Sequence, residues 1–295
     1  MPEFHIGDVV AAIITWLQDN MSGFFDGIAA VMQTLIDVVL AALTAPHPFV
    51  IVALAAALAF WARGIGFAVF SLLGLLLVDS MQLWGQTMET LAIVLVASIV
   101  AVLVGVPAGI WAARSSRAST VIRPVLDFMQ TLPVFVYLIP AVFLFGIGVV
   151  PAVVATFIFA IPPGVRLTEL GLRQVDPEMV EASIAFGAKP WQLLRQVQLP
   201  LAVPSIMAGI NQVIMMALSM VVIAGMVGAG GLGAVVVQGI SRLDIGVGFE
   251  GGLGVVFLAI FLDRLTSAFP RPRRRPRTEA IEALEPEAEP APAAA

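Results

Sequence analysis

The chain has 295 residues, of which 60% are hydrophobic and only 12% are charged, and its mean hydropathy is +1.01. A soluble domain carries about 25% charged residues, so this composition excludes a soluble globular protein and indicates a polytopic membrane protein. The absence of cysteine excludes disulfides and thiolate metal sites, and the net charge of −5 points to no particular partner.

Eight segments are apolar enough to be predicted as membrane spans, since a helix needs roughly 20 apolar residues to cross a bilayer. They are residues 28–44, 48–62, 65–79, 88–113, 125–147, 149–165, 203–225 and 250–268. The second and third are short, so they form either a tight hairpin or one broken element. Residues 4–20 have helical amphipathic spacing, which predicts a helix lying on the membrane. The expected fold class is therefore all-α.

Basic residues fall almost entirely on one side of this arrangement. Fourteen of the 15 lysines and arginines lie in alternate connections, at the end of the eighth span (Arg264) or in the C-terminal tail, and only Arg242 lies on the other side. Because basic loops stay in the cytoplasm, both termini of this multi-pass protein are predicted to be cytoplasmic. Residues 270–295 are first basic and then acidic with many Pro and Ala, which predicts a disordered tail.

One polar segment, VEASIAFGAKPWQLLRQVQLP at residues 180–200, interrupts the apolar runs. Asp176 and Pro177 suit the N-cap and first position of a helix, and Gly187 is placed to end that helix in the left-handed conformation. Lys189-Pro190 begins a second short helix, which Leu199-Pro200 is predicted to end. Helices this short need a surface to rest on.

The spacing of this segment resembles the EAA loop of permeases from binding-protein-dependent ABC importers. It reads Glu181-Ala182-Ser183, three residues, Gly187, nine residues, then Val197-Gln198-Leu199-Pro200, with Ser183 and Val197 as mild departures from Ala and Ile. Stretches at 130–148, 199–233 and 239–246 extend the resemblance to the proline/glycine betaine importers, over about 85–270. It implies a type I ABC importer permease of a bacterial cell membrane. The implied organisation is an N-terminal segment (1–27), accessory helices (28–84) and a core domain (85–269) with its EAA loop at 167–200.

In that family the EAA loop docks on a cytoplasmic ABC ATPase. The resemblance implies a set of ATPase-coupling residues: Glu178, Glu181, Ala182, Ser183, Phe186, Gly187, Ala188, Leu199 and Pro200. It also implies an extracytoplasmic substrate-binding protein and, because the chain has one EAA loop and supplies one half, a second copy in a homodimer. Lipid is a further expected partner and nucleic acid is not. The implied function is ATP-driven import of an osmoprotective solute: glycine betaine, proline betaine, proline, choline or carnitine.

The chain is not expected to hydrolyse ATP itself. A P-loop requires Gly-Lys-Ser/Thr, and the single lysine, Lys189, is followed by proline. No paired carboxylates, Ser–His pair or metal-ligand cluster suggests an enzyme, so no catalytic or metal site is predicted. ATP and Mg²⁺ are expected on the partner ATPase, with no cofactor in this chain.

Polar side chains within the predicted spans are candidates for the translocation path, because they are costly in lipid. They are Gln130, Thr131, Tyr137, Asn211, Gln212 and Ser219, with Met215 between the last two. For any one of them, helix–helix hydrogen bonding is the alternative. Eleven of the 26 glycines fall between Gly225 and Gly254, which predicts irregular or re-entrant backbone serving as a gate or docking surface, or else close helix packing.

An ATP-independent secondary transporter or channel for small osmolytes is the alternative function. Such carriers usually show inverted repeats and ionisable residues in mid-span. Here Asp37 is the one acid near the centre of a predicted span, and no repeat is visible.

Overall fold

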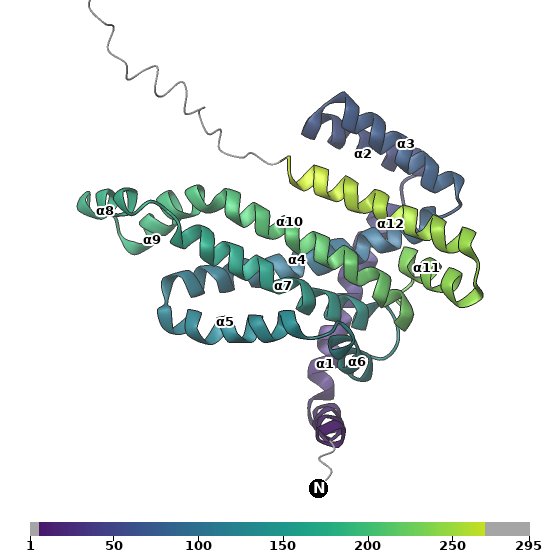
Figure 1. Cartoon of the computed structure of the whole chain (residues 1–295), viewed down its shortest axis with the longest axis horizontal. Helices are drawn as coiled ribbons and strands as arrows, with labels where there is room; N and C mark the ends of the chain where they lie inside the picture. The colour runs from purple at the N-terminus through teal and green to yellow at the C-terminus, as the bar shows by residue number, and fades with distance from the viewer. Residues whose placement is uncertain (1–5, 269–295) are drawn as a thin grey trace, which may run out of the picture.

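The computed structural model describes residues 6–268 and contains helices and short connections, with no strand in that range (Figure 1). Five stretches are long and apolar enough to cross a membrane, and a bent helix pair makes a sixth. The five are α1 (Ile6–Thr44), α4 (Trp84–Arg114), α7 (Val149–Arg173), the stretch containing α10 (Leu199–Ala224), and α12 (Ile245–Thr266). The predicted tail, 270–295, lies outside the described residues.

Helix α7 lies at the centre, packed between α4 and α10. Glycines make this close packing possible. A Cβ added at Gly109 of α4 would lie 2.6 Å from the Val165 carbonyl oxygen of α7, and one added at Gly171 of α7 would lie 2.6 Å from the Ser205 Cβ of α10. Small residues let helix backbones approach closely where lipid is as apolar as the side chains.

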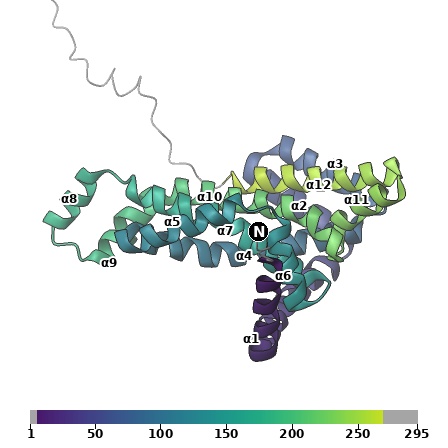
Figure 2. The same ribbon diagram turned by 60° about the horizontal axis from the view of Figure 1, so that its bottom comes forward.

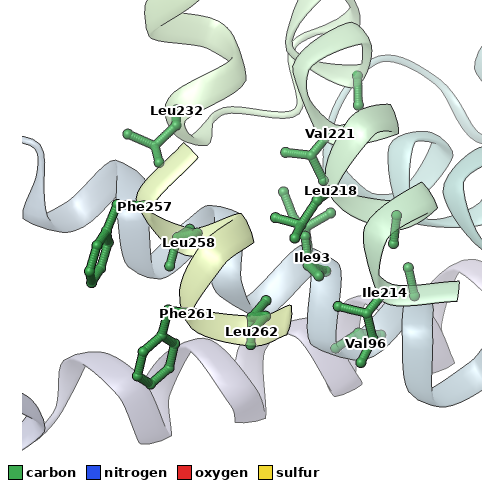
Figure 3. Close-up of a cluster of buried hydrophobic side chains, with 14 of the residues drawn as sticks. Ile93, Val96, Ile214, Leu218, Val221, Leu232, Phe257, Leu258, Phe261 and Leu262 are labelled. Carbon is green, nitrogen blue, oxygen red and sulfur yellow. The ribbon is translucent and has the colours of Figure 1, made fainter. Parts of the chain in front are cut away.

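A buried apolar cluster joins α4, α10 and α12 to α11 (Gly231–Arg242), as Figure 3 shows. Side chains from α4 and α10 meet on one side of it, and the ring of Phe257 and the neighbouring side chains of α12 lie on the other. The labelled members are Ile93, Val96, Ile214, Leu218, Val221, Leu232, Phe257, Leu258, Phe261 and Leu262. This cluster holds the last two helices against the central three.

Helices α2 (Pro48–Arg63) and α3 (Ile65–Ser80) form the tight hairpin that was one of the two predicted arrangements. Gly64, with φ +82°, makes the turn between them in a conformation that other residues rarely adopt. The hairpin leans on α12, where Gly74 leaves room for the Phe257 ring: an added Cβ would lie 1.9 Å from a ring carbon.

The bounds predicted for the fifth span, 125–147, are wrong. The chain instead forms α5 (Ser116–Thr131) and α6 (Phe135–Phe145), bent by 95° at the intervening residues. The cause is Pro133, which has no N–H and holds Leu132 in extended geometry (φ −71°, ψ 136°). The carbonyl of Met129 lies four residues before the proline. It accepts a hydrogen bond from the Tyr137 hydroxyl in place of the missing backbone N–H.

The predicted stop at Leu199-Pro200 is also wrong. The short α9 (Pro190–Leu193) continues through a π-helical stretch, η1 (Leu194–Gln198), directly into α10. Leu199 is helical (φ −61°, ψ −49°) and its N–H bonds the Leu194 carbonyl five residues back, so the wider turn accommodates the proline. Helix α7 likewise runs beyond 165 to Arg173, so residues 167–173 belong to a helix of the bundle and not to the loop.

Most of the glycine-rich region is helical, which contradicts the predicted irregular backbone. A single 3-10 turn, η2 (Gly225–Val227), leads to α11 and then α12. A Cβ at Gly225 would lie 2.3 Å from the Gly233 backbone, and one at Gly239 would lie 2.4 Å from Gly248. The glycines therefore serve close helix packing, which was the other interpretation of this stretch.

Helix α1 is continuous across the predicted boundary between a surface helix and a span. It leaves helical geometry at Met21 (φ −129°, ψ 21°), where it kinks. In Figures 1 and 2 it runs across the direction of α4, α7 and α10, and its first turns extend away from the bundle. Its main contacts within the described residues are with α4, α6 and α7.

Candidate functional site

The polar segment forms α8 (Pro177–Ala185) at one end of the bundle, where Figures 1 and 2 show it projecting beyond α7 and α10. Its predicted start is confirmed. Asp176 is the N-cap, its carboxylate accepting the Glu178 N–H at 2.9 Å, and Pro177 occupies the first turn where no N–H is needed. Glu178 and Glu181 follow in the first turns, at the positive end of the helix dipole.

The predicted end of α8 is confirmed as well. Gly187 has φ +82°, and its N–H bonds the Ile184 carbonyl at 2.8 Å, while the Ala188 N–H bonds the Ser183 carbonyl at 3.1 Å. A left-handed glycine closes a helix in this way because it lacks a Cβ. The chain then reverses into α9, where the Gln192 side chain accepts the Lys189 N–H at 2.9 Å.

The surface of α8 suits docking to another protein. The helix has no buried residue, and its main contacts are with α9 and η1. Large apolar side chains stand in solvent beside the acids: Phe186 is 93% exposed, and Met179, Ile184 and Trp191 are more than half exposed. Exposed apolar groups gathered at one place mark interaction surfaces.

The predicted coupling residues divide into two groups. Most lie on the exposed part of α8 and its cap: Glu178, Glu181, Ala182, Phe186 and Gly187, with Ser183 and Ala188 half-buried. Leu199 instead packs at the base of the loop with Leu172, Leu194 and Ala202, and Pro200 lies one position further along α10. Leu199 therefore belongs to the support of the loop, whereas Pro200 is exposed at the start of α10.

A buried carboxylate network near this end was missed in the sequence. Glu169 of α7 is 3% exposed, and its Oε1 accepts from Ser119 Oγ at 2.8 Å and from Arg123 Nη2 and Arg173 Nε, each at 2.9 Å. Arg173 Nη2 also donates to the Ala112 carbonyl of α4 at 2.9 Å. The spacing of Glu169 and Arg173, four apart on a helix, is the one local signal of this network.

The candidate path residue Asn211 lies in a contact between α10 and α12. Its Nδ2 donates to Asp263 Oδ1 at 2.9 Å, and its Oδ1 accepts from Thr266 Oγ1 at 2.6 Å. The structure therefore gives Asn211 the helix–helix hydrogen bonds that were the alternative interpretation of each such residue.

Three other candidates share the open face of α10. Gln212, Met215 and Ser219 are all exposed, and their spacing of three and four residues places them in one stripe. Gln130 and Thr131 are exposed at the end of α5, while Tyr137 is partly buried in the α5–α6 corner, with its ring 6.2 Å from that of Phe159. Within residues 6–268, no hydrogen bond joins the group on α10 to the group at this corner.

Two amides of the glycine-rich stretch at 228–233 are occupied by the protein's own side chains. The Gly231 N–H donates to Glu89 Oε2 at 2.7 Å, and the Leu232 N–H donates to Thr90 Oγ1 at 2.8 Å. These contacts from α4 cap the first turn of α11, which leaves this turn unsuited to a phosphate. In the described part of the chain, no group of three or more potential ligand side chains suits a metal ion.

Comparison with known proteins identifies relatives over nearly the whole chain. Residues 105–275 match the family described as binding-protein-dependent transport system inner membrane component. The chain is 46% identical over 266 residues to the glycine betaine transport system permease protein OpuAB of Bacillus subtilis, covering 90% of this chain and 94% of that protein.

Two further likenesses agree with this one. The glycine betaine/proline betaine transport system permease protein ProW of Escherichia coli is 49% identical over 264 residues, covering 88% of this chain and 74% of that protein. The inward-facing MetNI methionine ABC transporter superimposes with a TM-score of 0.57 and 25% identity, covering 62% of this chain and 94% of that one.

Proposed function

Because the chain belongs to the family of binding-protein-dependent transport system inner membrane components, we propose that it is the permease of an ABC importer for glycine betaine or a closely related osmolyte. It is a multi-pass protein of the bacterial inner membrane. Relatives that carry glycine betaine, proline betaine or carnitine in their names support this substrate class. The proposed role of the protein is therefore osmoprotection, through the uptake of such a solute.

The observation that carries the mechanism is the shape of α8. A short helix with no buried residue and a fixed cap at each end carries both acids and apolar side chains, and it stands clear of the bundle. Such a helix suits the groove of a partner, where its apolar face is buried and its acids meet basic groups. The partner in this proposal is a cytoplasmic ABC ATPase, which binds ATP and Mg²⁺ and hydrolyses the nucleotide.

The basic residues support the orientation in which α8 faces the cytoplasm. Arg63 Nε donates to the Arg264 carbonyl at 3.0 Å, so the turn after α2 lies beside the end of α12. Arg114 and Arg173 line one cavity with Glu181 of α8, so the ends of α4 and α7 lie near the loop. Clustering of arginines at the α8 end agrees with the positive-inside rule.

The exposed stripe of Gln212, Met215 and Ser219 supports a path formed between two copies of the chain. A polar stripe on an apolar helix is costly against lipid, and a second copy across a twofold axis would cover it. Gln130 and Thr131 on the polar helix α5 are the second set of path residues. The solute is delivered by an extracytoplasmic binding protein at the opposite end of the bundle.

Reconstitution tests the function directly. The chain, its ATPase and its binding protein are placed in proteoliposomes, and radiolabelled glycine betaine uptake is measured with and without ATP. Uptake that requires all three components and ATP is expected. Equal uptake by vesicles that contain the chain alone would establish an ATP-independent carrier instead.

A further inference from the structure

A cavity separates α8 from the bundle. Its volume is about 300 Å³, and it lies between α8 and the adjoining ends of α4, α7 and η1. Its lining includes Val180 and Glu181 of α8, Ala113 and Arg114 of α4, Arg173 of α7 and Gln198 of η1. Since the main contacts of α8 are with α9 and η1, the helix is held at its C-terminal side and has space beneath it.

Arg173 connects this cavity to three helices of the bundle. Its Nε donates to Glu169 on its own helix, and its Nη2 donates to the Ala112 carbonyl near the end of α4. Through Glu169 it is linked to Ser119 and Arg123 of α5. A guanidinium is planar and rigid, so two partners fix its orientation while donors remain for a third.

The charges around the cavity are complementary but not paired. Glu181 makes no ion pair in the described range, although Arg114 and Arg173 line the same cavity. Glu169, which is buried, already neutralises part of the charge of Arg173. If α8 closed onto the bundle, the carboxylate of Glu181 would approach both guanidinium groups as water left, and their attraction would strengthen.

We propose that Arg173 is the positioning residue that transmits movement of α8 to α4, α5 and α7 as the cavity closes. The proposal rests on the proposed function, because it requires α8 to be moved by the ATPase. It assigns to Arg173 a task beyond docking: the residue acts by holding the ends of α4, α5 and α7 together, which requires no contact with the ATPase or the solute. Loss of the joint would leave ATP hydrolysis running without transport.

The test uses the complete transporter in proteoliposomes, with ATP hydrolysis and glycine betaine uptake measured in the same sample. In Arg173→Gln, the number of solute molecules taken up per ATP is expected to fall about tenfold, the change that corresponds to losing one charge-assisted contact. The ATPase should still co-purify and hydrolyse ATP. Arg173→Lys should be intermediate, because an ammonium can pair with Glu169 but cannot present the same planar fork to Ala112.

Arg166→Gln is the matched control. Arg166 also lies on α7 and pairs with Asp127 of α5, but it does not line the cavity. This variant should keep the wild-type ratio of uptake to hydrolysis. An unchanged ratio in Arg173→Gln would overturn the proposal, and so would loss of ATPase binding in that variant, since the residue would then stabilise the docking surface only.

Closure of the cavity has its own test. The double variant Ala113→Cys with Val180→Cys joins the two walls, in a chain with no native cysteine. Disulfide formation in the complete transporter should differ in rate between nucleotide-free and ATP-bound states. An equal rate in all states would overturn closure. If the wild-type complex shows no ATP-dependent uptake, the proposed function fails, and this result is seen before any variant is compared.

Discussion

The hydroxyl of Tyr137 donates to the carbonyl of Met129, across the corner where α5 ends and α6 begins. Met129 lies four residues before Pro133, so its carbonyl is the acceptor whose helical donor the proline removes. A side chain thus replaces a missing backbone N–H, and the 95° corner between the two helices is held at its inner side.

Tyr137→Phe should therefore loosen this corner at a cost of about 1 kcal/mol, the usual value of one hydrogen bond. The measurement is the midpoint of thermal inactivation of the purified complex, which should fall. Tyr137 is the single tyrosine of the chain, so the change removes one hydroxyl and leaves the ring.

Pro133→Ala provides the control for that prediction. Alanine restores an N–H at position 133 and lifts the restriction on Leu132, so that a helical residue 132 would bring this N–H to the Met129 carbonyl. In the Pro133→Ala background, Tyr137→Phe should lower the midpoint less than it does in the wild type, as a double-mutant cycle measures. Equal effects in both backgrounds would show that the hydroxyl does not serve this carbonyl.

Gly187 should be intolerant of substitution because of its backbone. At φ +82° an alanine costs about 1 kcal/mol or more, and a proline cannot adopt the angle at all. Gly187→Pro is expected to abolish ATPase co-purification and uptake while the chain remains in the membrane, and Gly187→Ala to weaken both. Gly66→Ala is the matched control, since Gly66 has ordinary backbone geometry and open space at its Cβ. Full uptake by Gly187→Pro would contradict the proposal that α8 couples the chain to the ATPase.

The parts of the site that could be predicted from sequence are those determined by local backbone chemistry. Asp176, Pro177 and Gly187 specify α8 through caps that depend on residues within one turn. The parts that could not be predicted depend on partners far along the chain. The Gly231 N–H meets Glu89, which is 142 residues away, and Asn211 meets Asp263, which is 52 away. No spacing rule links such pairs.

Two prolines show that the same local signal can have different outcomes when the tertiary surroundings differ. Pro133 and Pro200 each follow a leucine, and the residue before a proline is biased away from helical geometry. Leu132 is extended and the helix ends there, whereas Leu199 stays helical because the preceding π-helical turn accommodates the ring. The difference comes from the packing of Leu194 and Leu199 at the base of the loop, which is tertiary and not local.

Asn211 and Gln212 are neighbours with different expected effects. Asn211→Leu removes the donor to Asp263 and the acceptor for Thr266, so it should destabilise the α10–α12 contact by about 1–3 kcal/mol. Gln212→Leu leaves these bonds intact and should lower uptake while thermal stability is kept. Measuring both quantities for both variants separates packing from path. Reduced uptake without loss of thermal stability in Asn211→Leu would indicate that Asn211 acts in the translocation path and not only in helix packing.

Ser219 tests the twofold arrangement. It lies in the exposed stripe of α10 with Gln212 and Met215, and among residues 6–268 its hydroxyl bonds only the Met215 carbonyl of its own helix, at 3.0 Å. If the stripe faces its symmetry mate across the path, Ser219→Cys should form a disulfide between two copies on mild oxidation, visible as a dimer in denaturing gels.

The matched control is Leu73→Cys on α3, a position that is 61% exposed but lies on the outer hairpin, away from α10. With no native cysteine, any cross-link must come from the introduced residue. A dimer from Ser219→Cys and none from Leu73→Cys would place α10 at the twofold axis. A homodimer brings identical positions together only near its twofold axis. Cross-linking of Leu73→Cys alone would therefore place the α2–α3 hairpin, and not α10, at that axis. A complex that contains one copy of the chain, measured by native mass spectrometry, would exclude the homodimer in either orientation.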